Sequence, residues 1–242
     1  MASMQIPSGD DYHSKKAWRK AFGQALSQLP DHHIAAQSAK ATDKLKRLEV
    51  YRNARSISVF LSMPKGELQT SDIVRHALNS GKNVFVPYIR SKPASMDMLQ
   101  LQNEEDFESL QPDKWGIPSL DSSSVKQRLN CLGHQGLDNQ NGPEDAGEGG
   151  LDIILVPCVA FDEDFNRLGH GKGYYDRFLT RYFGSKDKDG NAYRKPYLIG
   201  LALQEQLLKG PDRLPMEDWD HKVDALLLSD HFLSRSSSSH AS

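Results

Sequence analysis

The chain has 242 residues, of which 38% are apolar and 26% are charged, so it is long enough for one large domain with a substantial core. Its 30 Lys and Arg against 32 Asp and Glu give a formal net charge of -2, which argues against a global field that attracts nucleic acid or an anionic membrane. No stretch approaches the run of about 18 apolar residues that a transmembrane helix needs. We therefore expect no nucleic-acid partner and no membrane partner.

The N-terminal segment and the two cysteines favour a cytoplasmic protein. Asp10 and Asp11 lie in a segment that lacks arginine and an apolar core, unlike a signal or transit peptide. Cys131 and Cys158 have neither a C-x-x-C partner nor metal-ligand spacing, which is typical of reduced thiols. Because Cys158 follows Pro157 inside an apolar run, we interpret it as a packed small hydrophobe rather than a reactive thiol.

The first half of the chain alternates helices and strands. Apolar spacing predicts helices over 14–29 and about 31–48, separated by Pro30. Apolar and β-branched runs predict strands over 56–62, 83–89 and 96–101, and a helix over 71–79. The order strand, helix, strand favours a parallel sheet with a right-handed crossover.

The second half continues this alternation. The most continuous apolar run, 151–161, predicts a central strand buried on both faces. A glycine-rich turn and a helix over 174–183 follow, and further strands are predicted over 197–203 and 223–228. The whole pattern predicts an α/β fold with a mostly parallel central sheet.

The domain prediction is a single unit with flexible ends. The α/β domain spans 14–232, after a flexible N-terminus at 1–13. Segments rich in Gly, Asn and Gln at 130–150, and a similar one at 184–195, are predicted to be flexible insertions. The serine-rich tail, 233–242, is predicted to be disordered.

The turn at 167–176 is the most informative segment of the chain. It reads Arg167-Leu168-Gly169-His170-Gly171-Lys172-Gly173-Tyr174-Tyr175-Asp176 and joins a strand to a helix. Glycines allow close backbone approach, the free N–H groups of the helix start attract anions, and Lys172 adds a positive charge, so phosphate is the expected guest. The spacing matches neither the P-loop nor the dinucleotide pattern, and a mobile surface loop is the alternative. A carboxylate beside bound phosphate needs a cation between them, so Asp176 is a candidate Mg²⁺ ligand.

Other candidate residues lie at some distance along the chain. Lys15 and Arg19 share one helix face, which is either solvated or a cationic edge for a polyphosphate. Glu67 follows a strand at the edge where open α/β sheets bind ligands. Trp115 either covers the core or stacks on a planar heterocycle. Asp220 or Asp224 is a cap, a solvated acid or a second metal ligand.

Together these segments resemble one known family. The matching motifs are Lys15-x-x-x-Arg19, Phe60-Leu61-Ser62-Met63 with Glu67-x-x-Thr70, Met96-Asp97-Met98, Trp115-Gly116-Ile117-Pro118, Val156-Pro157-x-x-x-Phe161-Asp162, the glycine turn through Asp176, and Asp220-x-x-Val223-Asp224. In this order they resemble the 5-formyltetrahydrofolate cyclo-ligases, also called methenyltetrahydrofolate synthetases, over about residues 14 to 230. The turn with Tyr-Tyr-Asp is the most specific part of the resemblance.

The resemblance implies a fold and a reaction. The fold is a Rossmann-like three-layer α/β/α domain. The reaction converts 5-formyltetrahydrofolate to 5,10-methenyltetrahydrofolate, with ATP as co-substrate and Mg²⁺ as cofactor, and releases ADP and phosphate. The partners are then these small molecules, and we expect a cytoplasmic monomer.

The resemblance also implies site residues. Lys172, Arg167 and Tyr174 are the expected catalytic residues, and Asp176 and Asp220 the expected metal ligands. The expected ATP-binding residues are Lys15, Lys16, Arg19, Arg167, Leu168, Gly169, His170, Gly171, Lys172, Gly173, Tyr174 and Tyr175. The expected folate-binding residues are Leu61, Glu67, Trp115, His170, Gly171, Lys172, Gly173 and Tyr174.

The chain departs from the family pattern at His170, where relatives carry arginine or tyrosine, so the charge there depends on pH. Loop 63–67 and segment 130–150 are also longer than in compact members. Two other readings remain open, because fold alone does not fix function. One is a sugar-phosphate isomerase-like or CoA-transferase-like enzyme, and the other is a non-catalytic nucleotide-binding domain.

Overall fold

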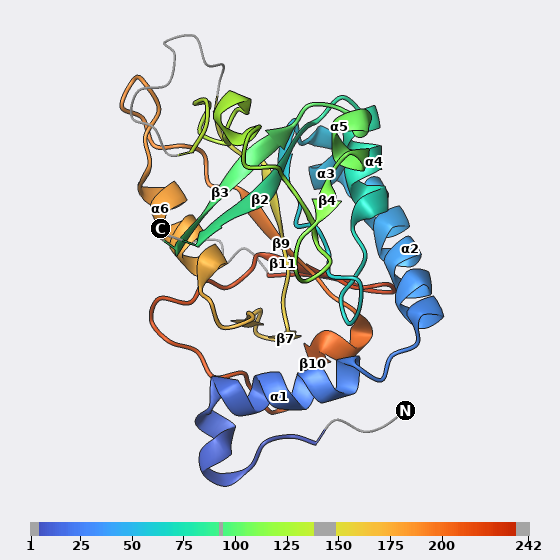
Figure 1. Ribbon diagram of the computed structural model, residues 1–242. Coiled ribbons are helices and arrows are strands. Elements are labelled where there is room, and N and C mark those ends of the chain that lie inside the picture. The colour runs from blue at the N-terminus through green and yellow to red at the C-terminus, as the bar shows by residue number, and fades with distance from the viewer. Residues whose placement is uncertain (1–4, 92–93, 138–148, 236–242) are drawn as a thin grey trace.

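A seven-stranded sheet forms the centre of the molecule (Figure 1). The structure is a computed structural model, and it describes residues 5–91, 94–137 and 149–235. The strand order is β12-β11-β9-β6-β1-β2-β3, in which the five inner strands run parallel and the edge strands β12 and β3 run antiparallel to their neighbours. The strands of this sheet are β1 (Ser56–Ser58), β2 (Asn83–Ser91), β3 (Ala94–Leu101), β6 (Ile153–Val156), β9 (Tyr197–Leu201), β11 (Ala225–Leu227) and β12 (Phe232–Ser234).

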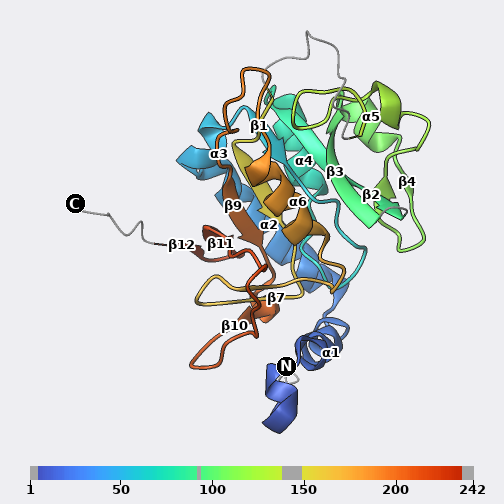
Figure 2. The same cartoon turned by 90° about the vertical axis from the view of Figure 1, so that its left-hand side faces the viewer.

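Helices cover both faces of the sheet. Figure 1 shows α2, α3 and α4 on one side and α6 on the other, and Figure 2 shows α6 lying over the strands from the side. The helices are α1 (Lys15–Leu26), α2 (Asp31–Arg47), α3 (Glu49–Asn53), α4 (Ser71–Asn79), α5 (Glu104–Glu108) and α6 (Tyr174–Gly184), with short 3-10 helices at Gly9–His13, Val125–Gln127 and Gln204–Gln206. The predicted three-layer α/β/α fold with a mostly parallel sheet is confirmed.

The sheet is buried on both faces at its centre, where strand β6 is apolar at every position. All four residues of β6 are buried, and alternate residues point to opposite faces. Ile153 and Leu155 pack in the core under α2 and α4, whereas Ile154 and Val156 pack in the core under α6. The predicted crossover between β1 and β2 is also present, since these strands pair in parallel with α4 between them in the chain.

The order of the strands reverses between β1 and β6. From β1 the chain moves to β2 and β3 on one side, and from β6 it moves to β9 and β11 on the other. The segments that leave the carboxyl ends of β1 and β6 therefore diverge to opposite faces and leave a crevice between them. Open α/β sheets bind ligands at such a point.

Two predicted strands are shorter than expected. The run 151–161 is not one strand, because the chain leaves the central sheet after β6 at Pro157, which has no N–H to donate to the ladder. Its second part forms β7 (Ala160–Asp162) in a separate sheet with β8 (Arg167–Leu168) and β10 (Leu207–Leu208). Likewise, β1 ends at Ser58 instead of residue 62. A third sheet pairs β4 (Gln111–Pro112) with β5 (Pro118–Ser119).

The segments predicted to be flexible contain some regular structure. Strand β12 takes in Leu233 and Ser234, which the sequence predicts to lie in the disordered tail, because their backbone pairs with β11. A 3-10 helix forms at Gly9–His13, and a bridge joins Lys186 to Ala192 within the predicted insertion at 184–195. Most of the predicted insertion at 130–150 and the end of the tail, 138–148 and 236–242, lie outside the described residues. Among the helices that the structure describes, none combines the length and apolar content needed to cross a bilayer.

Candidate functional site

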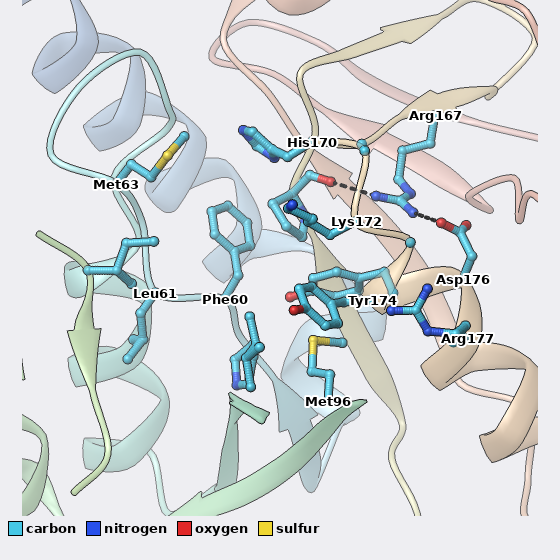
Figure 3. Close-up of a pocket in the computed structure, with 18 of the residues that line it drawn as sticks. Phe60, Leu61, Met63, Met96, Arg167, His170, Lys172, Tyr174, Asp176 and Arg177 are labelled. Atoms are coloured by element: carbon cyan, nitrogen blue, oxygen red, sulfur yellow. Dashed lines mark hydrogen bonds and ion pairs between the residues drawn. The ribbon is translucent and has the colours of Figure 1, made fainter. Parts of the chain in front are cut away.

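A cavity of about 1610 Å³ opens where the carboxyl ends of β1 and β6 diverge. Typical sites for one small molecule measure about 300–1,000 Å³, so this cavity has room for two ligands. Segments from the whole chain line it: α1, the loop after β1, strands β2 and β3, the 113–120 turn, the glycine turn and the 217–220 turn. Figure 3 shows Leu61 and Met63 on one wall facing His170, Lys172 and Tyr174 on the other.

Two glycines of the turn adopt positive φ angles that other residues rarely adopt, and each lies close to an arginine side chain. Gly171 has a φ of +87°, and a Cβ there would lie 3.1 Å from the Arg19 guanidinium carbon. Gly173 caps the start of α6 in the left-handed region, with a φ of 62°, and a Cβ there would lie 2.9 Å from Arg177. Both positions therefore require glycine. The turn leads directly into the N-terminus of α6, whose free N–H groups favour an anion.

Cations from two elements surround this turn. The Arg19 Nε donates a hydrogen bond of 2.7 Å to the Gly169 carbonyl, which fixes α1 against the turn. Burial lowers the pKa of Arg19, an effect that Asp220 partly offsets. Lys172 is exposed, and its ammonium makes no ion pair or hydrogen bond with the part of the chain that the structure describes. Its charge is therefore available to a ligand.

His170 is held neutral by its surroundings. Although the side chain still meets solvent, the walls of the cavity desolvate the ring, and Arg167 and Arg19 repel its protonated form. These effects lower the pKa of His170 below its usual value of 6.5. At neutral pH the ring is therefore a hydrogen-bonding group rather than an additional cation.

Arg167 and Asp176 form an ion pair inside the wall. The Arg167 side chain is 5% exposed, and its Nη2 donates to the Asp176 Oδ2 at 2.8 Å, as Figure 3 shows. Burial alone would raise the pKa of Asp176, but the charge and the hydrogen bond of Arg167 outweigh burial and hold the pKa below its usual value. Arg167 thus keeps Asp176 ionised at the edge of the cavity.

Asp220 and Asp176 both line the cavity, and a backbone contact joins their segments. The backbone N–H of His221 donates to Asp176 Oδ1 at 3.3 Å, and Asp220 forms an ion pair with Lys15. Within the described ranges, no group of three or more His, Cys, Asp or Glu side chains could hold a metal ion by itself. Mg²⁺ is commonly held by one or two carboxylates together with substrate phosphates, so this pair fits a Mg²⁺ bound with a nucleotide.

Glu67 is an acid in an apolar setting. It is 4% exposed, it lines the cavity, and its Oε2 accepts a 2.8 Å hydrogen bond from the Met63 N–H. Burial raises the pKa of Glu67 to about 7, although the Met63 hydrogen bond opposes this effect. A buried acid with a pKa raised in this way is typical of a binding or catalytic group.

The wall around Glu67 is apolar and carries an exposed aromatic ring. Phe60 and Leu61 are buried beside Glu67 on the same loop. Trp115 is 60% exposed, and the next residue, Gly116, approaches Pro64 so closely that a Cβ would lie 2.7 Å away. The Trp115 turn is therefore packed on the loop that carries Glu67. This arrangement favours the stacking interpretation of Trp115 over simple core cover.

The cavity brings together almost all of the residues that the sequence singled out. Lys15, Arg19, Leu61, Glu67, Trp115, Asp220 and every residue from 167 to 176 line it. Lys16 does not line it, because it lies one position along α1 from Lys15 and faces solvent. Asp224 is not beside Asp176 either: its Oδ2 accepts a 2.9 Å hydrogen bond from Leu198 N in the sheet.

Sequence reasoning missed several residues of this site. Arg177 and Arg181 on α6 line the cavity, as do Glu217 and Trp219 before Asp220. For Arg177 a signal was present, since it follows the glycine turn in the first turn of α6. No pattern in the sequence marked Trp219.

The family model for the 5-formyltetrahydrofolate cyclo-ligase family matches residues 11–229. The chain belongs to this family. A probable 5-formyltetrahydrofolate cyclo-ligase of Schizosaccharomyces pombe is 33% identical over 217 residues, covering 88% of this chain and 94% of the relative. The 5-formyltetrahydrofolate cyclo-ligase of Mus musculus is 32% identical over 217 residues, covering 90% and 94%.

Solved structures agree on the fold. A 5,10-methenyltetrahydrofolate synthetase from Aquifex aeolicus aligns with a TM-score of 0.61 and 24% identity, covering 91% of this chain and 92% of that one. The cyclo-ligase resemblance and the prediction of a ligase are thereby confirmed. The roles of individual site residues stay predictions.

The two cysteines are not among the residues that line the cavity. Both are buried and free. Burial raises the pKa of Cys131 to about 12, and burial followed by the charge of Glu67 raises that of Cys158 well above its usual value. Thiols with raised pKa values are poor nucleophiles at neutral pH, which favours the packed interpretation.

Proposed function

We propose that this cyclo-ligase uses phosphoryl transfer from ATP to close the ring of 5-formyltetrahydrofolate, giving 5,10-methenyltetrahydrofolate, ADP and phosphate. The observation that carries the proposal is one cavity, large enough for two ligands, with a cationic glycine turn on one wall and a buried acid on the other. The family membership favours the same reaction.

The nucleotide would occupy the glycine-turn wall. Its phosphates suit the N-terminus of α6, the exposed ammonium of Lys172 and the guanidinium of Arg19. Lys15 would exchange its present partner, Asp220, for a phosphate oxygen. Each such contact would contribute about 2–4 kcal/mol of transition-state stabilisation.

The pterin would occupy the opposite wall. An ionised Glu67 accepts hydrogen bonds at two oxygens, so it suits the adjacent amino and ring N–H groups of a pterin. Trp115 offers its exposed face for stacking, and Leu61 supplies apolar contact. This arrangement points the formyl group toward the glycine turn across the cavity.

The chemistry follows from bringing the two substrates together. The formyl oxygen attacks the γ-phosphorus, and the bond from that phosphorus to the bridging oxygen breaks to release ADP. N10 then adds to the activated formyl carbon and loses its proton, and the C–O bond breaks to release phosphate. The protein mainly positions the groups and stabilises charge, as is usual in phosphoryl transfer.

Asp176 and Asp220 would hold the Mg²⁺, which supplies neutralisation of phosphate charge when it is bound. Arg167 would act through Asp176, because it is buried against that carboxylate and keeps it ionised. Tyr174 would orient the substrates at the start of α6. We further propose a cytoplasmic monomer.

One assay tests the proposal. Purified protein is mixed with 5-formyltetrahydrofolate, ATP and Mg²⁺, and the near-ultraviolet absorbance of the methenyl product is recorded with and without ATP. We expect product only when ATP is present. Binding of ATP without turnover would indicate the non-catalytic nucleotide-binding alternative, and equal rates without ATP would indicate chemistry of the isomerase kind.

A further inference from the structure

Large apolar side chains that are exposed gather at the cavity. In the part of the chain that the structure describes, four of them are exposed: Ile6, Ile89, Trp115 and Trp219. All but Ile6 line the same cavity. Single exposed apolar residues need no explanation, but a group of them around one cavity marks a binding surface.

Trp219 is the most exposed of these residues, at 65%, and it sits on a fixed turn. The turn is closed by two hydrogen bonds, from Asp220 N to Glu217 O at 3.0 Å and from Glu217 N to Asp220 Oδ2 at 2.7 Å. Its end is tied to α1 through the Lys15–Asp220 ion pair and to α6 through the bond from His221 N to Asp176. The backbone that carries Trp219 is therefore fixed, and the indole is left uncovered.

The two exposed tryptophans belong to different parts of the cavity. Trp115 is packed with the loop that carries Glu67, and the Lys114 ammonium lies 4.1 Å from the centre of its ring. Trp219 lies two residues from Glu217 and next to Asp220, both of which pair with Lys15 at the phosphate side. Among the described residues, no ring or cation contacts the Trp219 indole.

We propose that Trp219 stacks on the base of the nucleoside triphosphate whose phosphates bind at the glycine turn. This inference rests on the proposed function, because it needs a nucleotide in the cavity. Lys15, Arg19 and Lys172 recognise phosphate charge alone, so they do not distinguish ATP from inorganic triphosphate. An indole offers a flat apolar face to a purine, and such stacking adds affinity that the phosphates do not provide.

Tryptophan fluorescence separates the two rings. The chain has three tryptophans, and Trp18 is fully buried. The W115F variant therefore keeps Trp219 as its exposed tryptophan, and the W219F variant keeps Trp115. We expect ATP to quench W115F strongly and W219F weakly, and we expect inorganic triphosphate to quench neither strongly.

Affinity provides the second measurement. In W219A we expect ATP to bind about ten-fold or more weakly, with most of the loss restored in W219F, and inorganic triphosphate to bind as in the unmodified protein. KM for ATP should rise while KM for 5-formyltetrahydrofolate stays unchanged. Because the side chain is largely exposed, thermal unfolding of W219A should match that of the unmodified protein.

The possible failures are distinct. Unchanged ATP affinity in W219A, or quenching of Trp219 by 5-formyltetrahydrofolate instead of ATP, would overturn the stacking role and leave the proposed function standing. If neither ATP nor inorganic triphosphate binds the unmodified protein, both the stacking role and the proposed function are wrong.

Discussion

Replacing Glu67 with glutamine tests whether this acid is kept for a ligand at the expense of stability. The group is 4% exposed, and its pKa rises from the usual 4.5 to about 7. Because the folded state holds the proton more tightly than the unfolded state, stability is fully present below pH 4.5 and is lost as the pH rises through about 7. At about 1.36 kcal/mol per pH unit, the loss reaches about 3 kcal/mol.

The amide that E67Q introduces cannot ionise, and its oxygen can still accept the Met63 hydrogen bond. E67Q should therefore gain stability over the unmodified protein as pH rises, from about 1 kcal/mol at about pH 5 to about 3 kcal/mol at about pH 8.5. The same variant should bind 5-formyltetrahydrofolate more weakly and ATP unchanged, since a carboxylate acceptor is lost.

Denaturant unfolding at the two pH values measures the first effect, and calorimetry measures the second. Glu105 is exposed, and the matched E105Q variant should show neither change. A stability difference between E67Q and the unmodified protein that does not vary with pH would refute the reasoning, because the acid would then ionise as easily as an exposed one.

Three further variants test the phosphate wall. G171A places a Cβ at a positive φ against a guanidinium, whereas its control G190A places one at a positive φ in open space. Both variants should therefore lose about 1–2 kcal/mol of unfolding free energy in denaturant unfolding, but only G171A should weaken ATP binding in calorimetry. K172A should lower turnover about 10²-fold or more without changing the unfolding temperature. The control K16A, at a residue outside the cavity, should match the unmodified protein in the absorbance assay. Near-normal turnover of K172A would show that Lys172 takes no part in the chemistry. D220N should raise the Mg²⁺ concentration needed for half-maximal rate, and an unchanged Mg²⁺ titration would reject its role as a ligand.

The sequence predicted the parts of the fold that depend on local pattern. The apolar run before the glycine turn and the helix after it are strong signals, and together they place this turn between a strand and a helix. Pro157 carried a signal that the apolar pattern hid, since a residue without an N–H interrupts a central strand. Strand β12 was not predicted because its pairing with β11 is a tertiary contact, and the neighbouring serines are typical of a disordered tail.

The site was predicted best where residues are close in sequence. The burial of Glu67 could not be read from its own segment, because it depends on how the loop after β1 folds back into the core. The sequence also could not separate Lys16 from Lys15, because the two lysines differ only in the direction in which their side chains leave α1. Trp219 could not be identified from the sequence because contacts with α1 and α6 bring its turn to the cavity. One of these contacts joins Lys15 to Asp220, which lies 205 positions further along the chain.

The central claim is that the formyl oxygen attacks the terminal phosphoryl group of ATP inside this cavity, and an isotope measurement tests it directly. The substrate is prepared with ¹⁸O in its formyl group, and the released inorganic phosphate is analysed by mass spectrometry. The account predicts one ¹⁸O atom in each phosphate, because the oxygen leaves carbon only as part of the phosphate. Unlabelled phosphate formed alongside the methenyl product would contradict the account.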